Sequence, residues 1–221
     1  MRTPQDKGEC YLCCEPATTR DHIPPRGIFT QPYPNNLITV PACAKCNNGA
    51  SKDDEYFRIA VAAGSCDSPE SLAVLKQRIL PKVGGKPALA ISILNTVEKV
   101  DVYSEGGIYL GKAPTIKIDW PRIQNVINRI VRGLYWKHEN ERLPANSIVT
   151  DCFYKPKLSE AHQGVISQLP LYQIGNGNVF SYSYLIDEAD RSHSFWYLMF
   201  YDDTSLFMVE TIAGGPQQNK K

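Results

Sequence analysis

The sequence lacks the long apolar segments that membrane proteins and secreted proteins carry. Its 221 residues contain no run of about 18 apolar residues, which is the length that a membrane-spanning helix needs. The opening segment, MRTPQDKGEC, has no apolar stretch of the kind found in a signal peptide. We therefore expect a cytoplasmic protein that makes no membrane contact.

An excess of one charge is also missing. The 24 Lys and Arg residues are almost balanced by 23 Asp and Glu residues, which gives a formal net charge of +1. The chain as a whole does not attract a polyanion, so binding to nucleic acid would have to come from a local group of Lys and Arg. The hydrophobic fraction of 43% is typical of a globular protein, and the length allows one large domain or two small ones.

Cysteine, by contrast, is plentiful, with seven residues in the chain. In a reducing compartment, cysteines bind metals more often than they form disulfides. Structural zinc is held by thiolates in a tetrahedral shell, and two C-x-x-C pairs provide such a shell. The sequence therefore predicts a zinc site that helps to fold the N-terminal region, on Cys10, Cys13, Cys43 and Cys46. The alternative is a set of buried or free thiols.

Three cysteines lie outside these pairs. Cys14 directly follows Cys13 and would replace it as a ligand only with a different loop geometry, so the pattern leaves it without a role. Cys66 and Cys152 are predicted to be ordinary core residues.

The 29 residues between the two cysteine pairs include Asp21-His22, the one place in the chain where a carboxylate directly precedes a histidine. Adjacent residues on a strand point to opposite faces, so one can hold a metal while the other faces a nucleophile. Histidine suits general-base catalysis because its pKa lies near neutrality. Taken alone, such a dipeptide is usually a surface histidine held by hydrogen bonds.

The dipeptide does not stand alone. Residues 8 to 56 carry, in order, C-x-x-C, DHIPP with a downstream Gly27, Asn36-Leu37, and a second C-x-x-C followed at once by Asn47. This order resembles the HNH endonuclease family, in the variant that has asparagine at the last motif position. The resemblance implies a β-hairpin and a helix that grip one divalent metal, braced by a separate structural zinc.

The resemblance also implies a role for each motif residue. His22 matches the general base, and Asp21 matches the metal ligand that precedes it. Asn36 matches the asparagine that braces the loop, with Asn35 as the alternative. The position that completes the metal shell matches Asn47, with Asn48 as the alternative if the register slips by one.

The implied reaction is metal-dependent hydrolysis of phosphodiester bonds in nucleic acid, most readily DNA. Asp and Asn oxygens suit a hard cation, Mg²⁺ or Mn²⁺, which would polarise the phosphate and stabilise the leaving oxygen. Arg20, Arg26 and Lys52 are candidate phosphate contacts, although solvated surface charges would have the same sequence signature. The other function that we consider is a catalytically silent, zinc-stabilised module that binds nucleic acid or protein. By analogy with bacterial HNH proteins, a role in phage defence is a further hypothesis.

The rest of the chain predicts a second part. We expect an α+β protein in which a zinc-braced ββα-metal domain, residues 1–63, precedes a larger mixed α+β domain, residues 64–221, with an antiparallel C-terminal sheet. The larger part is a candidate for substrate selection, regulation, binding of a partner protein or self-association. Apolar spacings of three and four predict a helix from Pro121 to about His138, with arginines on its solvated face. The aromatic-rich segments 178–187, 194–202 and 204–211 are predicted to be core strands.

Overall fold

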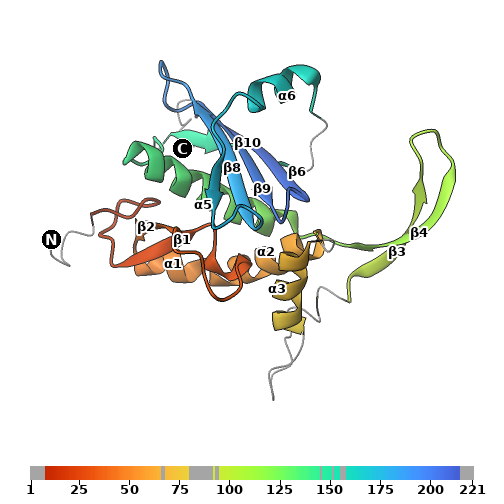
Figure 1. Ribbon diagram of the computed structural model, residues 1–221. Coiled ribbons are helices and arrows are strands. Elements are labelled where there is room, and N and C mark those ends of the chain that lie inside the picture. The colour runs from red at the N-terminus through yellow and green to blue at the C-terminus, as the bar shows by residue number, and fades with distance from the viewer. Residues whose placement is uncertain are drawn as a thin grey trace, which may run out of the picture.

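The computed structural model describes residues 8–65, 68–79, 92, 95–144, 146–150, 152–154 and 158–214 (Figure 1). It is a mixed α+β fold in which a small N-terminal hairpin and three helices precede a long helix and an antiparallel sheet. The helices are η1 (Arg26–Ile28, a single 3-10 turn), α1 (Ala44–Gly49), α2 (Ser51–Ala63), α3 (Pro69–Ile79), α5 (Trp120–Glu139) and α6 (Glu160–Ile166). The strands are β1 (Thr19–Ile23), β2 (Ile38–Ala42), β3 (Val97–Tyr103), β4 (Tyr109–Ile116), β5 (Ser147–Val149), β6 (Phe153–Tyr154), β7 (Tyr172–Ile174), β8 (Phe180–Ile186), β9 (Ser194–Phe200) and β10 (Ser205–Ala213).

The N-terminal hairpin pairs β1 with β2 in an antiparallel register that sets Asp21 opposite Val40 and His22 opposite Thr39. Alternate residues of β1 are buried, so Asp21 and Ile23 point toward α5 while His22 lies on the other face. The chain then continues directly through α1 into α2, where acidic residues occupy the first turn and favour the helix N-terminus. A β-hairpin followed by a helix is therefore present in the region where the motifs lie.

Helix α5 is the element that joins the two ends of the chain. Pro121 stands in its first turn, where no hydrogen-bond donor is needed, and Asn140 ends it in the left-handed conformation. Its apolar stripe is fully buried, as the spacing predicts, and consists of Ile123, Val126, Ile127, Ile130, Val131 and Leu134. The helix contacts the hairpin and α2, and Figure 1 shows it running beneath the C-terminal sheet.

The C-terminal sheet contains six antiparallel strands in the order β5-β10-β9-β8-β7, with β6 also paired to β10. Its aromatic side chains form core, as predicted: Trp196, Phe180 and Phe200 have no exposed surface. Phe57 of α2 packs edge-on against Phe200, with ring centroids 5.5 Å apart. The N-terminal helix and the C-terminal sheet thus share one hydrophobic cluster.

This shared core bears on the predicted division into residues 1–63 and 64–221. Buried residues from both segments belong to the same hydrophobic cluster, so in the structure the two parts pack as neighbours with a common interior. The division remains a prediction about folding units. Cys66 lies outside the described residues, whereas Cys152 is buried, as expected.

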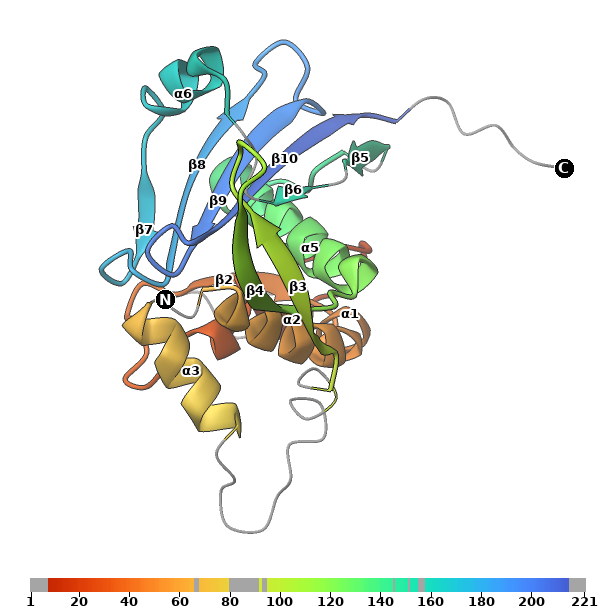
Figure 2. The same cartoon turned by 90° about the vertical axis from the view of Figure 1, so that its right-hand side faces the viewer.

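The hairpin of β3 and β4 departs from this packing. It extends from the body as an arm, seen from two sides in Figures 1 and 2. Most of its side chains are exposed, including the apolar residues Val100, Tyr103 and Leu110. Strand β4 ends at Ile116, and Trp120 already begins α5. None of the described helices is long and apolar enough to cross a membrane.

The close packing of α5 on the hairpin can be tested by substitution of Gly133. A Cβ added there would lie 2.5 Å from Cγ1 of the buried Ile23. We expect Gly133→Ala to lower the free energy of unfolding by about 1–3 kcal/mol, because the helix and β1 must move apart. Chemical denaturation of purified protein measures this change.

The matched control is Gly164→Ala on the exposed helix α6, where an added Cβ meets nothing within 4 Å. That variant should be more stable than the parent by about 0.5–1 kcal/mol, since alanine is the better helix former. Equal effects of the two substitutions would contradict the close contact between α5 and β1.

Candidate metal centre and active site

The four cysteines of the two C-x-x-C pairs meet in the structure. Their sulfur atoms all lie within 4.8 Å of one another, and Sγ of Cys13 is 3.6 Å from Sγ of Cys43 and 3.5 Å from Sγ of Cys46. Cys43 is the N-cap of α1, where its sulfur accepts a hydrogen bond from the backbone N–H of Cys46. That hydrogen bond lowers the pKa of the Cys43 thiol to about 7, which favours the thiolate that a metal requires.

The cluster has the dimensions of a zinc site. With zinc–sulfur bonds of about 2.3 Å, the edges of a tetrahedral shell measure about 3.8 Å. The observed sulfur separations are close to that length, so four thiolates can close around one ion with little movement. A closed shell leaves no position for a substrate, and this centre therefore suits a structural metal.

Cys13, and not Cys14, belongs to the cluster. Cys14 has a backbone φ of 66°, and its side chain is exposed and contacts the guanidinium of Arg142. The left-handed backbone at this position turns the chain back after the first C-x-x-C pair, which directs Cys14 away from the other three sulfurs. The structure thus identifies Cys13, rather than Cys14, as the second cysteine of the cluster.

Asp21 is held by a buried network of charged and polar groups. The side chain of Asp21 is 6% exposed, and its Oδ2 accepts a hydrogen bond of 2.7 Å from the Tyr11 hydroxyl. The same oxygen accepts a bond of 2.5 Å from Arg129 of α5. The Arg129 guanidinium also donates to Asp54 of α2 at 2.6 Å. One arginine therefore bridges a carboxylate on β1 and a carboxylate on α2.

Formation of this network costs free energy, because charged groups must leave water. Burial raises the pKa of Tyr11 well above its ordinary value, and the negative charge of Asp21 raises it further, so that the phenol stays a donor. Burial also raises the pKa of Asp54 to about 6, against the lowering effect of Arg129. Such buried pairs are unforgiving, because removal of one partner leaves the other charge uncompensated.

His22 faces away from this network. It is half-buried, and burial together with the nearby Arg26 guanidinium lowers the pKa of its imidazole, which Asp21 raises only partly. At neutral pH His22 is therefore uncharged and able to accept a proton. Its cross-strand neighbour Thr39 is fixed by Arg20, whose Nε donates to the Thr39 hydroxyl at 2.8 Å.

The two motif asparagines serve as braces. The amide nitrogen of Asn47 on α1 donates to Oγ1 of Thr19 at 3.1 Å and to the Arg20 carbonyl at 3.2 Å, which pins the helix to β1. Asn36 bonds to β7 and to the turn that follows it: it donates to the Gln173 carbonyl and accepts from the Gly175 N–H. Asn36 thus braces its loop against the C-terminal sheet, while no contact in the described residues links it to His22.

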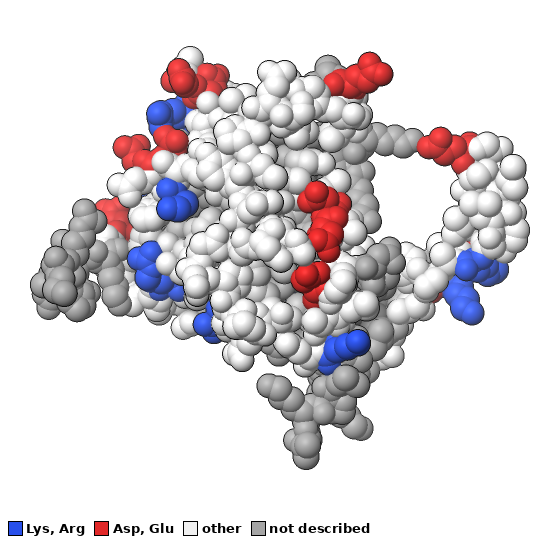
Figure 3. Space-filling view, in the orientation of Figure 1, with Lys and Arg blue, Asp and Glu red and all other residues white. Residues whose placement is uncertain are grey.

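The candidate phosphate contacts come from three elements, with Arg20 on β1, Arg26 on η1 and Lys52 on α2. Arg20, Arg26 and Lys52 are all exposed. Arg26 lies over the ring of Tyr33, with 5.0 Å from its guanidinium carbon to the ring centroid. On the face seen in Figure 3, Lys and Arg occur in small groups interspersed with groups of Asp and Glu. Phosphate binding by these residues stays a prediction.

Sequence reasoning missed three members of the buried network: Tyr11, Asp54 and Arg129. The arginines of α5 were expected on a solvated face, but the Arg129 side chain is only 12% exposed and Arg122 pairs with Asp53 at 2.8 Å. The available signal was their position, since charges next to the apolar stripe of a helix often lie at its boundary with the next element.

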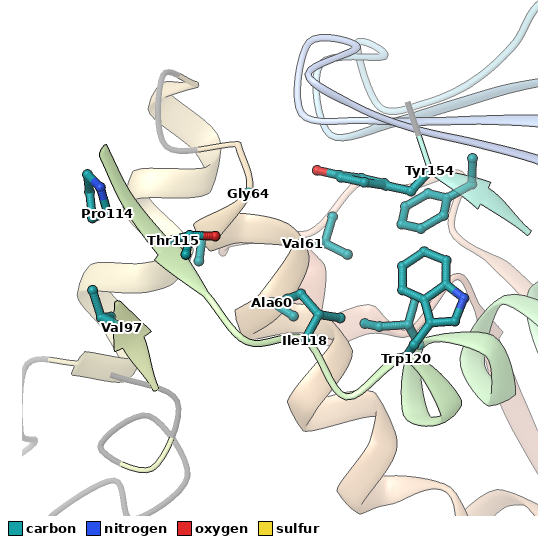
Figure 4. A pocket seen from close by; sticks show the side chains of 12 residues that line it. Ala60, Val61, Gly64, Val97, Pro114, Thr115, Ile118, Trp120 and Tyr154 are labelled. Atoms are coloured by element: carbon teal, nitrogen blue, oxygen red, sulfur yellow. The ribbon is translucent and has the colours of Figure 1, made fainter. Parts of the chain in front are cut away.

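A separate apolar pocket of about 450 Å³ lies where the arm joins the body. Figure 4 shows side chains converging on it from α2 (Val61), the base of the arm (Thr115) and the start of α5 (Trp120). Among the described residues that line it there is no Asp, Glu, His, Lys or Arg, and the polar groups of the HNH-like motif lie elsewhere. This pocket therefore offers no groups for phosphodiester chemistry.

Comparison with known protein families, with curated proteins and with solved structures finds no match to this chain. The four-cysteine cluster is thus established by the structure alone, and the family assignment stays with the resemblance of the motifs.

We expect one zinc ion per chain, bound by the cysteine cluster. Cys43→Ser should lose the metal and unfold the N-terminal region, because binding to four thiolates contributes to folding. Elemental analysis and circular dichroism measure these two effects. Cys14→Ser is the matched control and should keep one zinc. Metal-free protein that is fully folded would rule out the zinc site.

Arg129→Met tests the buried network. It removes the guanidinium shared by Asp21 and Asp54, and we expect a loss of about 3–5 kcal/mol in the free energy of unfolding. The control is Arg132→Met on the same helix, because Arg132 donates to Asn128 and to the Ser147 carbonyl, which are neutral. That variant should lose only about 1 kcal/mol. Losses of equal size, measured by denaturation, would contradict the special role of the ion pairs.

Proposed function

We propose that this protein is a metal-dependent endonuclease of the HNH type, with a structural zinc on the cysteine cluster and DNA as its substrate. The observation that carries the proposal is the setting of His22. It is an uncharged, half-buried histidine on a β-hairpin whose neighbouring helix is pinned to it by Asn47. A base that is already deprotonated at neutral pH is suited to take a proton from water.

Residues around His22 supply the other requirements of phosphodiester hydrolysis. The exposed guanidiniums of Arg20 and Arg26 lie close enough to lower the pKa of His22, so a phosphate beside the base would meet positive charge. Arginine suits this contact because its planar group can donate two hydrogen bonds to one phosphate. Lys52, at the start of α2, adds a further exposed cation.

Asp21 and Asn47 are the residues that would hold the catalytic metal, Mg²⁺ or Mn²⁺. Both offer oxygen donors, which these cations prefer. Tyr11 and Arg129 occupy Oδ2 of Asp21, while in the described part of the chain no hydrogen bond is formed to its Oδ1. The bound metal would polarise the scissile phosphate and stabilise charge on the leaving oxygen. The positive charge of Arg129 repels a metal cation, whereas its hydrogen bond to Asp21 holds the carboxylate in a fixed orientation for binding.

The ion pair between Arg129 and Asp21 also favours the second candidate function. A carboxylate already neutralised by a buried arginine at 2.5 Å needs no metal for stability. In that case the zinc-stabilised region would be a catalytically silent module that binds nucleic acid or protein. The two functions differ in whether the bound strand is cut.

Cleavage assays distinguish these functions. Zinc-loaded protein is incubated with supercoiled plasmid, linear DNA and RNA, with Mg²⁺ or Mn²⁺ added or removed by chelation. We expect metal-dependent cleavage, and we expect His22→Ala to lower its rate by about 10²–10⁴-fold, which is the usual contribution of a general base.

His162→Ala is the matched control, because His162 is exposed on α6 and bonds only to Ser159 among the described residues. It should cleave at the parental rate. Cleavage by His22→Ala at the parental rate would exclude His22 as the base. Binding of DNA by the parent without cleavage under any condition would favour the silent module.

A further inference from the structure

The arm formed by β3 and β4 is an unusual element for an isolated chain. A two-stranded hairpin is marginally stable in water unless a further layer or strand supports it. In the part of the chain that the structure describes, β3 pairs with β4 alone. The arm nevertheless exposes large apolar side chains, among them Val100 (42% exposed), Tyr103 (58%) and Leu110 (64%). Its composition therefore indicates a surface that is covered in the working protein.

The charge of the arm limits which class of molecule can bind to it. Residues 97–118 contain three lysines and three acidic residues, so the arm has no net charge. A neutral arm gains little from the phosphate backbone of nucleic acid, where binding depends on an excess of Lys and Arg. The arm is more suited to a protein surface whose charges alternate in the same way.

The two edges of the arm differ. Strand β4 contains Pro114, which has no N–H to donate, and Gly111 with a backbone φ of 118°. The register also shifts at Tyr103, which leaves Leu110 of β4 without a partner. Strand β3 contains neither proline nor glycine over its seven residues. Only β3 presents a regular edge for a further strand.

The sequence of β3 is complementary to itself. If two copies of Val97–Tyr103 pair antiparallel about Val100, Lys99 lies opposite the partner's Asp101, and the twofold symmetry repeats this pair. At both ends Val97 meets the partner's Tyr103, an apolar pair. Opposite charges and apolar side chains in directly facing positions stabilise a sheet.

Other registers are less favourable. Displacing the pairing by one residue in either direction sets residues whose backbone groups face the partner opposite residues whose backbone groups face away, so a regular ladder excludes it. Displacing it by two residues sets Lys99 opposite the partner's Lys99 or Asp101 opposite the partner's Asp101. Like charges in facing positions destabilise a sheet, so we expect the centred register to be the most stable one. It also uses all seven residues of the strand.

We propose that the protein forms a homodimer in which the β3 strands of two arms pair antiparallel about Val100, giving a four-stranded sheet. The side chain of Asp101, which already lies 3.6 Å from Lys112 of its own arm, would then be flanked by a second ammonium group from the partner's Lys99. A twofold interface of this kind is self-complementary and closed, so it yields a dimer and no larger assembly. This proposal is independent of the proposed nuclease function.

Charge reversal tests the pairing. Lys99→Asp replaces both attractive pairs with repulsive ones, and we expect the dimer to dissociate about tenfold more readily or more. The triple variant Lys99→Asp, Asp101→Lys, Lys112→Asp reverses the charge at these three positions and restores each opposite pair, so its dimerisation should return to the parental level. Sedimentation velocity of zinc-loaded protein across a range of concentrations measures the equilibrium.

All three positions are exposed on the arm, and zinc content together with thermal unfolding checks that each variant keeps its fold. A parental protein that stays monomeric throughout the micromolar range would overturn the proposal. So would a dimer that Lys99→Asp leaves unchanged, since the interface would then lie elsewhere.

Discussion

Two carboxylates and one guanidinium, largely shielded from water, hold the N-terminal hairpin to the rest of the chain. Arg129, in the middle of α5, reaches Asp21 on β1 and Asp54 on α2 at hydrogen-bond distance. Because a buried charge is tolerated only beside an opposite charge, the hairpin, α2 and α5 are held where Arg129 lies next to both carboxylates. The apolar contact between Gly133 and Ile23 lies on the same face of α5 and adds a steric limit to this electrostatic one.

The two sides of β1 therefore have different tasks. The inward side carries Asp21 and Ile23, which attach the hairpin to α5, and the outward side carries His22 with Arg20 at the surface. Because side chains alternate along a strand, Asp21 is fixed in the interior while the adjacent His22 faces solvent. The cysteine cluster fixes the start of the hairpin and the start of α1 at the other end, so the His22 strand is anchored from both directions.

Features encoded in neighbouring residues could be predicted, and features that depend on distant contacts could not. The apolar stripe of α5 follows from spacings of three and four, and the cysteine cluster follows from the paired C-x-x-C spacing. The partners of Arg129 lie 75 and 108 residues away, and that of Asn36 lies 137 residues away. No local periodicity records such pairings, because they arise only when the packed elements bring the side chains together. The choice of Cys13 over Cys14 depended on a single backbone angle.

The hydrogen bonds of Asn36 have a consequence for the long connection between β1 and β2. A loop of this length would ordinarily lose much conformational freedom when a ligand settles on it, and that loss would weaken binding. Here Asn36, at the far end of the loop, bonds to Gln173 of β7 and to Gly175 in the turn after it. This end of the loop therefore loses its conformational freedom when the chain folds, before any ligand binds. A molecule that contacts this end of the loop would meet a preorganised surface, and the C-terminal sheet would contribute to its affinity without touching it.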